Sequence, residues 1–270
     1  MKICNAVAFL AFSVLCGGPS ATAQPMPAPA WSVKYDCKQC IMWRDYAKGN
    51  PVTRLGIKPS LTGDATRIYV VYRGPRGVNR WVKGYLQVGG GQQLPVDFID
   101  FPTAHGERFI KLDLPSATVA TAMKASLWKM GGQRLKEFQL PLDGLPSAMP
   151  VLERCVADRL AQLGLDEASL SRIAEPPLTD LMKYFSSGDY PVLANNLGIS
   201  GKTQVRLLVG SDGRVLECYV KQGSGNALLD YVTCETFEKD VKFSPAKDVA
   251  GNAVASITTQ TIAWQAGSDK

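Results

Sequence analysis

Apolar and polar residues alternate along much of the chain between residues 31 and 140. The alternation is carried by the runs WSVKY (31–35), RIYVVYR (67–73), RWVKGYLQV (80–88), RFIKLDL (108–114), ASLWKM (125–130) and RLKEFQL (134–140). A period of two places one side of a strand in a core and the other side in water. Turn signals such as GPRGVN and GGGQQ separate the runs. The pattern predicts a β-rich domain, built as a small sandwich or a closed sheet.

The periodicity changes to a helical one after residue 142. Apolar side chains then recur every three or four residues, at Met149, Leu152, Val156, Leu160 and Leu163. This spacing predicts an amphipathic helix that starts near Pro150 and ends at Gly164. Residues 166–188 contain Pro176-Pro177 and SSGD, which indicate a linker.

The C-terminal part has a compact pattern of strand, strand, helix and strand. KTQVRLLVGSDGRVLECYVKQ (202–222) gives two alternating runs around a Gly-bearing turn, and GSGNALLDYVTCETFEK (223–239) has a helix start signal followed by a helical run. VKFSPAKD and GNAVAS are interpreted as a connecting loop, and SITTQTIAW (256–264) as the last strand. The expected fold is α+β, with one helix packed on an antiparallel three-stranded sheet.

The N-terminus has the features of an export signal. Lys2 precedes an apolar run, and small residues follow up to Ala21-Thr22-Ala23. The pattern predicts a signal peptide over residues 1–23, cut before Gln24, and then a Pro/Ala linker over 24–30. The alternatives are an uncleaved anchor, for which the run is short, and a lipoprotein. Cleavage would leave an exported chain without strong membrane association, in a compartment where disulfides persist.

Five cysteines follow the predicted signal, which is an odd number: Cys37, Cys40, Cys155, Cys218 and Cys234. Alternation places Cys218 on the strand face, shared with Leu216, that should meet the following helix. Cys234 lies at the margin of that helix's apolar side, so a stabilising disulfide between Cys218 and Cys234 is predicted. Either Cys40 or Cys37 is expected to pair with Cys155.

Composition excludes most catalytic classes. The only histidine is His105, so a histidine-based metal site or a Ser–His pair has little to build on. No phosphate-binding loop or hydrolase motif is present. We therefore expect a non-enzymatic protein without a cofactor, metal site or catalytic residue; carboxylates such as Asp97, Asp100 and Glu107 are the remaining enzymatic alternative. The formal net charge of +6 is spread along the chain. Strand alternation explains the aromatic residues near the basic runs, so no nucleic-acid partner is expected.

Residues from about 180 to 265 resemble the TonB C-terminal domain family. The resemblance is carried by Tyr190-Pro191, the strand 201–209, SDGRV (211–215), SGN (224–226) leading to Leu229-Asp230, FSPA (243–246) and IAW (262–264). The implied fold is the strand, strand, helix, strand unit expected above. The resemblance also supports a bacterial periplasm as the location.

The resemblance implies a protein partner in the envelope, such as an outer-membrane TonB-dependent transporter. Members bind a short extended segment of the partner, which adds a strand to the sheet. The edge implied here is the last strand, with Tyr190 and Pro191 nearby. The implied partner-binding residues of that strand are Ser256, Ile257, Thr258, Thr259, Gln260, Thr261 and Ile262.

Two departures from the family's energy transducers argue against energy transduction. Transducers keep an inner-membrane helix and a long Pro-rich spacer, and transporter-binding members carry a glutamine shortly before the Tyr-Pro pair, where this chain has Ser187-Gly188-Asp189. A membrane-anchored transducer and a ligand-binding β-domain protein remain the alternatives. Edge-paired or swapped homodimers are compatible with so small a sheet. The predicted division is 1–23 signal, 24–30 linker, 31–165 β-rich domain, 166–188 linker and 189–265 TonB-like domain.

Overall fold

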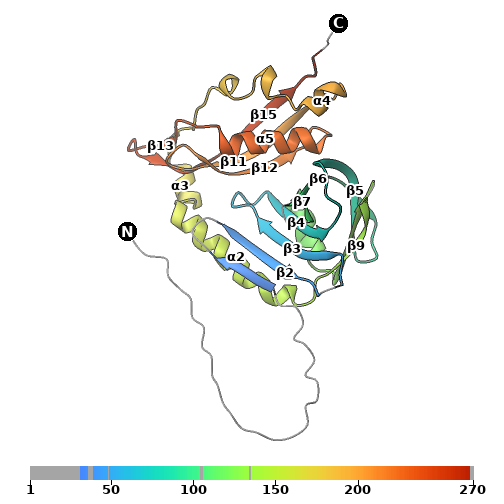
Figure 1. Cartoon of the computed structure of the whole chain (residues 1–270). Helices are drawn as coiled ribbons and strands as arrows, with labels where there is room; N and C mark the ends of the chain where they lie inside the picture. Colours follow the sequence, from blue (N-terminus) through green and yellow to red (C-terminus); the bar gives the residue numbers. More distant parts are fainter. Residues whose placement is uncertain (1–30, 36–38, 48, 104–105, 134, 268–270) are drawn as a thin grey trace, which may run out of the picture.

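The computed structural model describes residues 31–35, 39–47, 49–103, 106–133 and 135–267. The predicted signal peptide and Pro/Ala linker, Cys37 and His105 lie outside the described residues. Figure 1 shows a large curved sheet below and a smaller helix-bearing unit above it.

Nine antiparallel strands form the N-terminal sheet, in the order β1-β2-β3-β4-β7-β6-β5-β8-β9. Their bounds are Trp31–Tyr35 (β1), Cys40–Asp45 (β2), Val52–Pro59 (β3), Ala65–Arg73 (β4), Arg80–Val88 (β5), Gln93–Pro102 (β6), Glu107–Pro115 (β7), Leu127–Gly132 (β8) and Leu135–Pro141 (β9). A short helix, α1 (Ser116–Ala122), follows β7. The β-rich domain predicted from alternation is therefore confirmed as one continuous sheet.

The sheet curls so that its two ends approach each other around a core. Tyr46, which follows β2, donates a hydrogen bond to the carbonyl oxygen of Pro141 in β9 at 3.1 Å. The rings of Tyr72 in β4 and Phe138 in β9 lie 4.8 Å apart. Trp128 is fully buried in this core, and its indole N–H donates to the Ala122 carbonyl at 2.8 Å. One curled sheet thus provides the two facing layers of a sandwich-like domain.

Helix α2 (Leu145–Leu163) crosses the outer strands β1 and β2. The prediction that it starts near Pro150 was wrong, because the helix begins five residues earlier, at Leu145. Pro150 lies inside the helix, where it removes one backbone donor. A disulfide between Cys40 of β2 and Cys155 of α2 ties the helix to the sheet.

The C-terminal unit has the predicted three-stranded antiparallel sheet, in the order β12-β11-β15. Its strands are β11 (Gly201–Val209), β12 (Val215–Gln222) and β15 (Ser256–Trp264), and α5 (Ala227–Lys239) packs on one face. Asn226 caps α5 by accepting a hydrogen bond from the Leu228 N–H at 2.9 Å. Gly213 in the turn between β11 and β12 has a φ of 80°, and an added Cβ would lie 2.0 Å from the Phe243 carbonyl oxygen. Only glycine fits that position.

Residues 166–188, expected to form a linker, contain regular structure that contacts the C-terminal unit. They include α3 (Glu167–Ser171), β10 (Ile173–Glu175) and the 3-10 turn η1 (Leu181–Lys183), with η2 (Ser187–Asp189) and α4 (Val192–Asn196) following. The segment interpreted as a connecting loop instead forms β13 (Ala246–Asp248) and β14 (Ala253–Val254), because Gly251 allows the turn between them and β10 pairs with β13. Phe185 packs on Phe237 and Trp264, with ring centroids 5.0 and 5.9 Å away.

Candidate partner-binding edge

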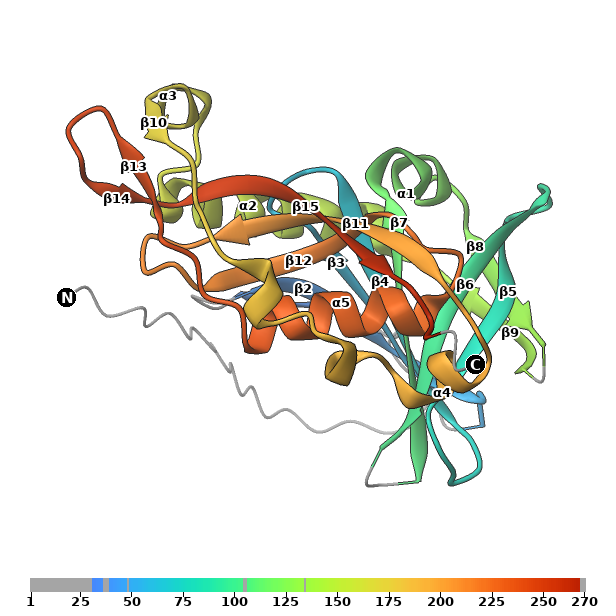
Figure 2. The same ribbon diagram turned by 90° about the horizontal axis from the view of Figure 1, so that it is seen from above.

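The C-terminal sheet has two edge strands, and they lie in different surroundings. β11 is the middle strand, β12 is one edge and β15 the other. Figure 2 shows α5 under this sheet and the strands of the N-terminal sheet beyond β12. An edge strand carries a row of N–H and C=O groups that can pair with another chain. Whether each edge is free therefore decides where a partner strand can be added.

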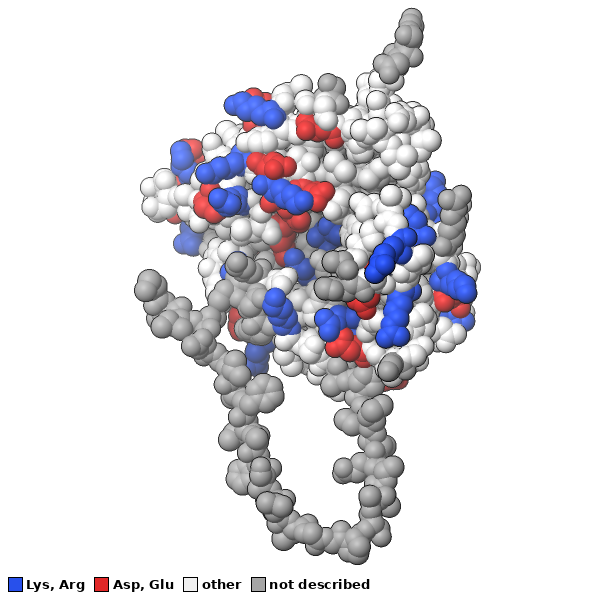
Figure 3. Space-filling view, viewed as in Figure 1, with Lys and Arg blue, Asp and Glu red and all other residues white. Residues whose placement is uncertain are grey.

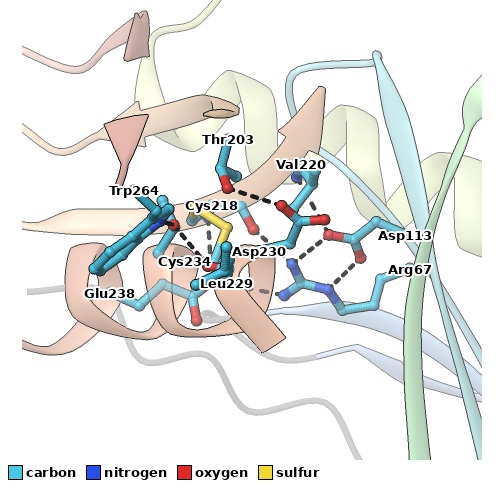
Figure 4. Close-up of a disulfide and its surroundings, with 11 residues drawn as sticks. Arg67, Asp113, Thr203, Cys218, Val220, Leu229, Asp230, Cys234, Glu238 and Trp264 are labelled. Atoms are coloured by element: carbon cyan, nitrogen blue, oxygen red, sulfur yellow. Dashed lines mark hydrogen bonds and ion pairs between the residues drawn. A yellow bond between two sulfur atoms is a disulfide. The ribbon is translucent and has the colours of Figure 1, made fainter. Parts of the chain in front are cut away.

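The β12 edge is closed by side chains. Arg67 of β4 donates from Nη2 to the Cys218 carbonyl oxygen at 2.6 Å, and Glu238 of α5 accepts from the Cys218 N–H at 3.1 Å. Asp113 of β7 accepts from the Val220 N–H at 3.4 Å. Figure 4 shows Arg67 and Asp113 reaching toward the strand from one side. Three consecutive backbone groups on this edge are therefore unavailable to a partner strand.

Arg67 and Asp113 form a bidentate ion pair that is buried between the N-terminal sheet and the C-terminal unit. The residues are opposite each other on β4 and β7, and the guanidinium donates to both carboxylate oxygens at 2.6 and 2.9 Å. Both side chains are buried, and Arg67 also lies over the Tyr219 ring at 4.4 Å. Burial opposes the charged form of Asp113, but the Arg67 guanidinium prevails and holds the pKa of that carboxyl below its usual value.

The face of β12 that bears Glu217 and Tyr219 is also buried against the N-terminal sheet. Glu217 forms an ion pair with Lys58 at 3.2 Å and accepts from the Leu61 N–H at 2.9 Å. Tyr219 is 1% exposed. The expectation that Leu216 shares the buried face with Cys218 was wrong, since Leu216 is exposed. Residue 217 faces the N-terminal sheet, while Cys218 turns toward α5.

The β15 edge has no strand partner other than β11 among the described residues. The direction in which each backbone group of β15 points can be deduced from the closed β12 edge. Cys218 directs its N–H and C=O away from β11, so Leu207 opposite it directs its own groups toward β15, where it faces Thr258. By alternation, Thr258, Gln260 and Ile262 pair with β11. The backbone groups of the intervening residues point outward, and these residues are Ile257, Thr259, Thr261 and Ala263.

The residues predicted to bind a partner lie in three environments. The middle of β15 is accessible, with Thr261 exposed and Thr259 and Gln260 half-buried. Its ends are less accessible, because Ser256 and Ile262 are buried. Ile257 and Thr258 are half-buried, and Ile257 packs on the cluster that contains Leu208.

Tyr190 and Pro191 lie beside the C-terminal end of β15. The Tyr190 ring meets Trp264 edge-on with centroids 5.4 Å apart, and its hydroxyl donates to the Ile199 carbonyl oxygen. Pro191 is the N-cap residue of α4, and the contacts of Tyr190 attach the start of this segment to Trp264 and Ile199. Val192, Leu193 and Leu197 of this segment are exposed. Figure 3 shows a largely uncharged surface at the upper right, over α4.

Each of the two structural units contains one disulfide, and the disulfide of the C-terminal unit lies next to the closed edge. Cys218 and Cys234 are bonded to each other, which links β12 to α5 directly behind the closed edge (Figure 4). Trp264 donates from its indole N–H to Thr233 of α5 at 2.8 Å, which links β15 to the same helix.

The three carboxylates considered for an enzymatic role do not form a common site. Asp100 is fully buried and is bound by Arg108 at 2.8 Å and by the Tyr72 hydroxyl at 2.9 Å. Arg80 completes this set, which fixes the β4–β5 connection. Asp97 lies on the outer face of β6, opposite Lys83 of β5, whereas Glu107 begins β7 just beyond the last β6–β7 pair, Pro102 with Arg108.

Sequence reasoning missed the interface residues Arg67, Asp113, Glu217 and Tyr219. Each charged member occupies a polar position of an alternating strand, which the pattern assigns to solvent. The only sequence feature that could have indicated an interface is the presence of charged residues on the predicted solvent-facing sides of strands in both parts of the chain.

Residues 187–266 match the model of the family described as Gram-negative bacterial TonB protein C-terminal. This part of the chain is a TonB C-terminal domain, as the resemblance predicted. No curated protein and no solved structure matches the chain. Members of this family are interaction domains, and the match indicates a TonB-like envelope protein involved in transport-related protein interaction. No helix of the described residues is long and apolar enough to cross a membrane.

Proposed function

We propose that this protein binds an extended segment of an envelope partner by adding it as a fourth strand beside β15. The observation that carries the proposal is the asymmetry of the two sheet edges. β12 is closed by Arg67, Asp113 and Glu238, whereas β15 has no second strand partner among the described residues. Backbone pairing supplies affinity in this mode of recognition, and neighbouring side chains supply selectivity.

The partner proposed is the periplasmic side of an outer-membrane TonB-dependent transporter. The support is the TonB C-terminal domain at 187–266 and the position of its unpaired edge. The exposed apolar residues of α4 lie beside the end of β15, where Gly267 donates to the Asn195 side chain at 3.1 Å. They offer a contact surface for apolar residues that flank the added strand.

The proposed location is the periplasm, after cleavage of the signal over residues 1–23. Two disulfides, Cys40–Cys155 and Cys218–Cys234, support an oxidising compartment. Fractionation of the protein from a bacterial host, with determination of its N-terminus, separates this proposal from the anchored transducer. A mature chain that begins at Gln24 in the soluble periplasmic fraction supports it, and an intact Met1 in the inner membrane overturns it.

Strand addition is tested with a substitution that removes one outward backbone donor. Thr261→Pro deletes an N–H that points away from β11, and an edge strand tolerates proline at such a position. Thr261→Val is the matched control, because it keeps the N–H and a branched side chain. The probes are synthetic peptides that copy the periplasmic N-terminal segments of TonB-dependent transporters. We expect Thr261→Pro to weaken binding at least tenfold and Thr261→Val to leave it within twofold.

The proposal fails if no such peptide binds the wild-type protein. It also fails if Thr261→Pro binds as well as Thr261→Val while thermal unfolding shows both to be folded. Gln260→Pro serves as the fold control, since it removes a donor that pairs with β11. It should lower the melting temperature far more than Thr261→Pro does.

A further inference from the structure

A cavity of about 410 Å³ lies where β6 and β7 separate within the N-terminal sheet. The two strands pair over only four residues each, and the pairing ends at Ile99 with Lys111, although β6 begins at Gln93 and β7 ends at Pro115. On their other sides these segments stay paired, β6 with β5 and β7 with β4. Figure 2 shows β5 and β6 bending away from β4 and β7. The sheet therefore has an internal gap between β6 and β7.

The residues at the gap explain why the two strands separate there. If the register of the β6–β7 pairing continued, the next pairs would be Asp97 with Asp113 and then Pro95 with Pro115. Two carboxylates directly opposite each other disfavour pairing, and two opposed prolines have no N–H to donate. The separation is therefore a consequence of the sequence at these four positions.

Backbone groups from both strands point into the gap. The Thr103 N–H donates to the Glu107 carbonyl oxygen at 2.8 Å, so the odd-numbered residues of β6 and β7 are those that bond across this pairing. By alternation, Asp97 and Asp113 direct their N–H and C=O groups into the gap, and Pro95 directs its C=O there. On that side these residues have no strand partner within the described part of the chain. The gap thus has an unpaired strand edge on each side.

The volume and the walls of the cavity limit what can enter it. A residue in a packed sheet occupies about 160 Å³, from a rise of about 3.3 Å, a strand spacing of about 4.8 Å and a sheet spacing of about 10 Å. The cavity therefore has room for about two to three residues of an extended chain. Its inner wall is apolar, because Phe98, Leu112 and Leu114 are buried in the core of the sheet, and Val220 and Tyr231 of the C-terminal unit line its outer side.

We propose that this gap binds a short extended peptide segment, which pairs with β6 at Asp97 and with β7 at Asp113. A peptide backbone is the complementary chemistry, because its N–H and C=O groups alternate in direction and match a strand edge on each side. The side chain that points inward is apolar, since it meets the wall formed by Phe98 and Leu112. Pro95 and Pro115 limit the pairing to a short segment. The site is separate from the proposed strand addition at β15, which uses the C-terminal sheet.

The test is calorimetric titration of the full protein with tripeptides that are acetylated at the N-terminus and amidated at the C-terminus, so that they carry no terminal charge. Their central residue is alanine, valine, leucine, phenylalanine or aspartate. We expect saturable binding that is at least tenfold tighter for the best apolar central residue than for aspartate. Methylation of the central backbone nitrogen of that peptide should weaken binding at least tenfold, because it removes a hydrogen-bond donor.

A pair of variants tests the backbone contact at β6. Asp97→Pro removes the N–H that faces the gap and leaves the pairing of β6 with β5 intact, and proline is tolerated at such an edge position. Asp97→Asn is the matched control, because it removes the charge and keeps the N–H. We expect Asp97→Pro to weaken tripeptide binding at least tenfold and Asp97→Asn to leave it within twofold. Thermal unfolding shows whether both variants are folded.

Absence of saturable binding of every capped tripeptide overturns the proposal, as does equal binding of the methylated and unmethylated forms. Equal binding by folded Asp97→Pro and Asp97→Asn also overturns it. Thr261→Pro should bind the tripeptides as the wild type does; loss of binding in that variant would place them at β15 and overturn the gap as their site, even if Asp97→Pro does not fold. Folded Asp97→Pro should bind transporter-derived peptides unchanged, so failure of the gap site and failure of strand addition at β15 are distinguishable.

Discussion

Arg67 and Asp113 are directly opposite each other on β4 and β7, and together they bind the backbone of β12 at Cys218 and Val220. The N-terminal sheet therefore takes the place of a neighbouring strand at this edge. Side chains from one unit satisfy the backbone groups of the other, and a second chain is kept from pairing there. The remaining edge, β15, has no strand partner other than β11 among the described residues, and it is the edge to which we propose that a partner strand is added.

Removal of either member of this pair should destabilise the protein strongly. Arg67→Met leaves Asp113 buried without its partner, and Asp113→Asn leaves the guanidinium uncompensated; each should cost about 3 to 5 kcal/mol. Denaturant unfolding measures the change. Arg54→Met is the control, because the Arg54–Asp45 pair is exposed and should contribute under about 1 kcal/mol. Equal effects at the two sites would contradict a structural role for the buried pair.

The same pair predicts a loss of stability in acid. Asp113 has a lowered pKa in the folded protein, so the folded state binds its proton less readily than the unfolded state does. Its contribution is complete above the unfolded pKa of about 3.9 and is lost as the pH falls through the lower folded value. Unfolding free energy should therefore decrease below about pH 4, and this decrease should be smaller in Asp113→Asn. If the unfolding free energy of Asp113→Asn decreased below pH 4 as much as that of the wild type, the prediction would be contradicted.

Lys111 of β7, whose ammonium group lies 5.3 Å from the Tyr231 ring centroid, predicts a second pH effect on stability, at alkaline pH. Its pKa is lowered to about 8, so between that value and the ordinary Lys value the unfolded state holds more protons. Stability should rise as the pH increases through this window. Lys111→Met should flatten this rise and stabilise the protein by about 1 kcal/mol at pH 7, after allowance for partial exposure. If Lys111→Met kept the wild-type increase of unfolding free energy with pH in this window, Lys111 would be excluded as the cause of that increase.

The two disulfides should differ in their contribution to stability. They close segments of 16 residues at Cys218–Cys234 and 115 residues at Cys40–Cys155. In the chain-entropy model these are worth about 3 and about 4.7 kcal/mol. Paired Cys→Ala variants, unfolded under non-reducing conditions, measure each value. A larger loss at the shorter loop would show that strain or residual structure dominates.

The sequence predicted the C-terminal unit well because local signals agree there. The turn at 210–213, the cap at Asn226 and the alternating runs each indicate the same order of elements, and the family resemblance supports it. In the N-terminal part, β2, β3 and β6 were missed. CIMWRD has no alternation that favours a strand over another buried segment, and QLPVDFIDFP contains two prolines.

The contact between the N-terminal sheet and the C-terminal unit could not be predicted from the periodicity of the sequence. A charged residue in an alternating strand has the same sequence signal whether it meets water or a second sheet. Arg67, Asp113 and Glu217 are buried because another unit covers them, and that contact joins residues more than a hundred positions apart. That β12 is closed while β15 has no strand partner other than β11 among the described residues follows only from this contact.

The measurement that tests the central claim most directly is amide hydrogen exchange of β15, residue by residue, with and without a transporter-derived peptide. Thr258 and Gln260 pair with β11 and should be protected in both states. The outward amides of Ile257, Thr259 and Thr261 should exchange fast in the free protein and at least tenfold more slowly in the complex. Protection that appears instead on β12, or no change at these three amides when the peptide is bound, would contradict strand addition at β15.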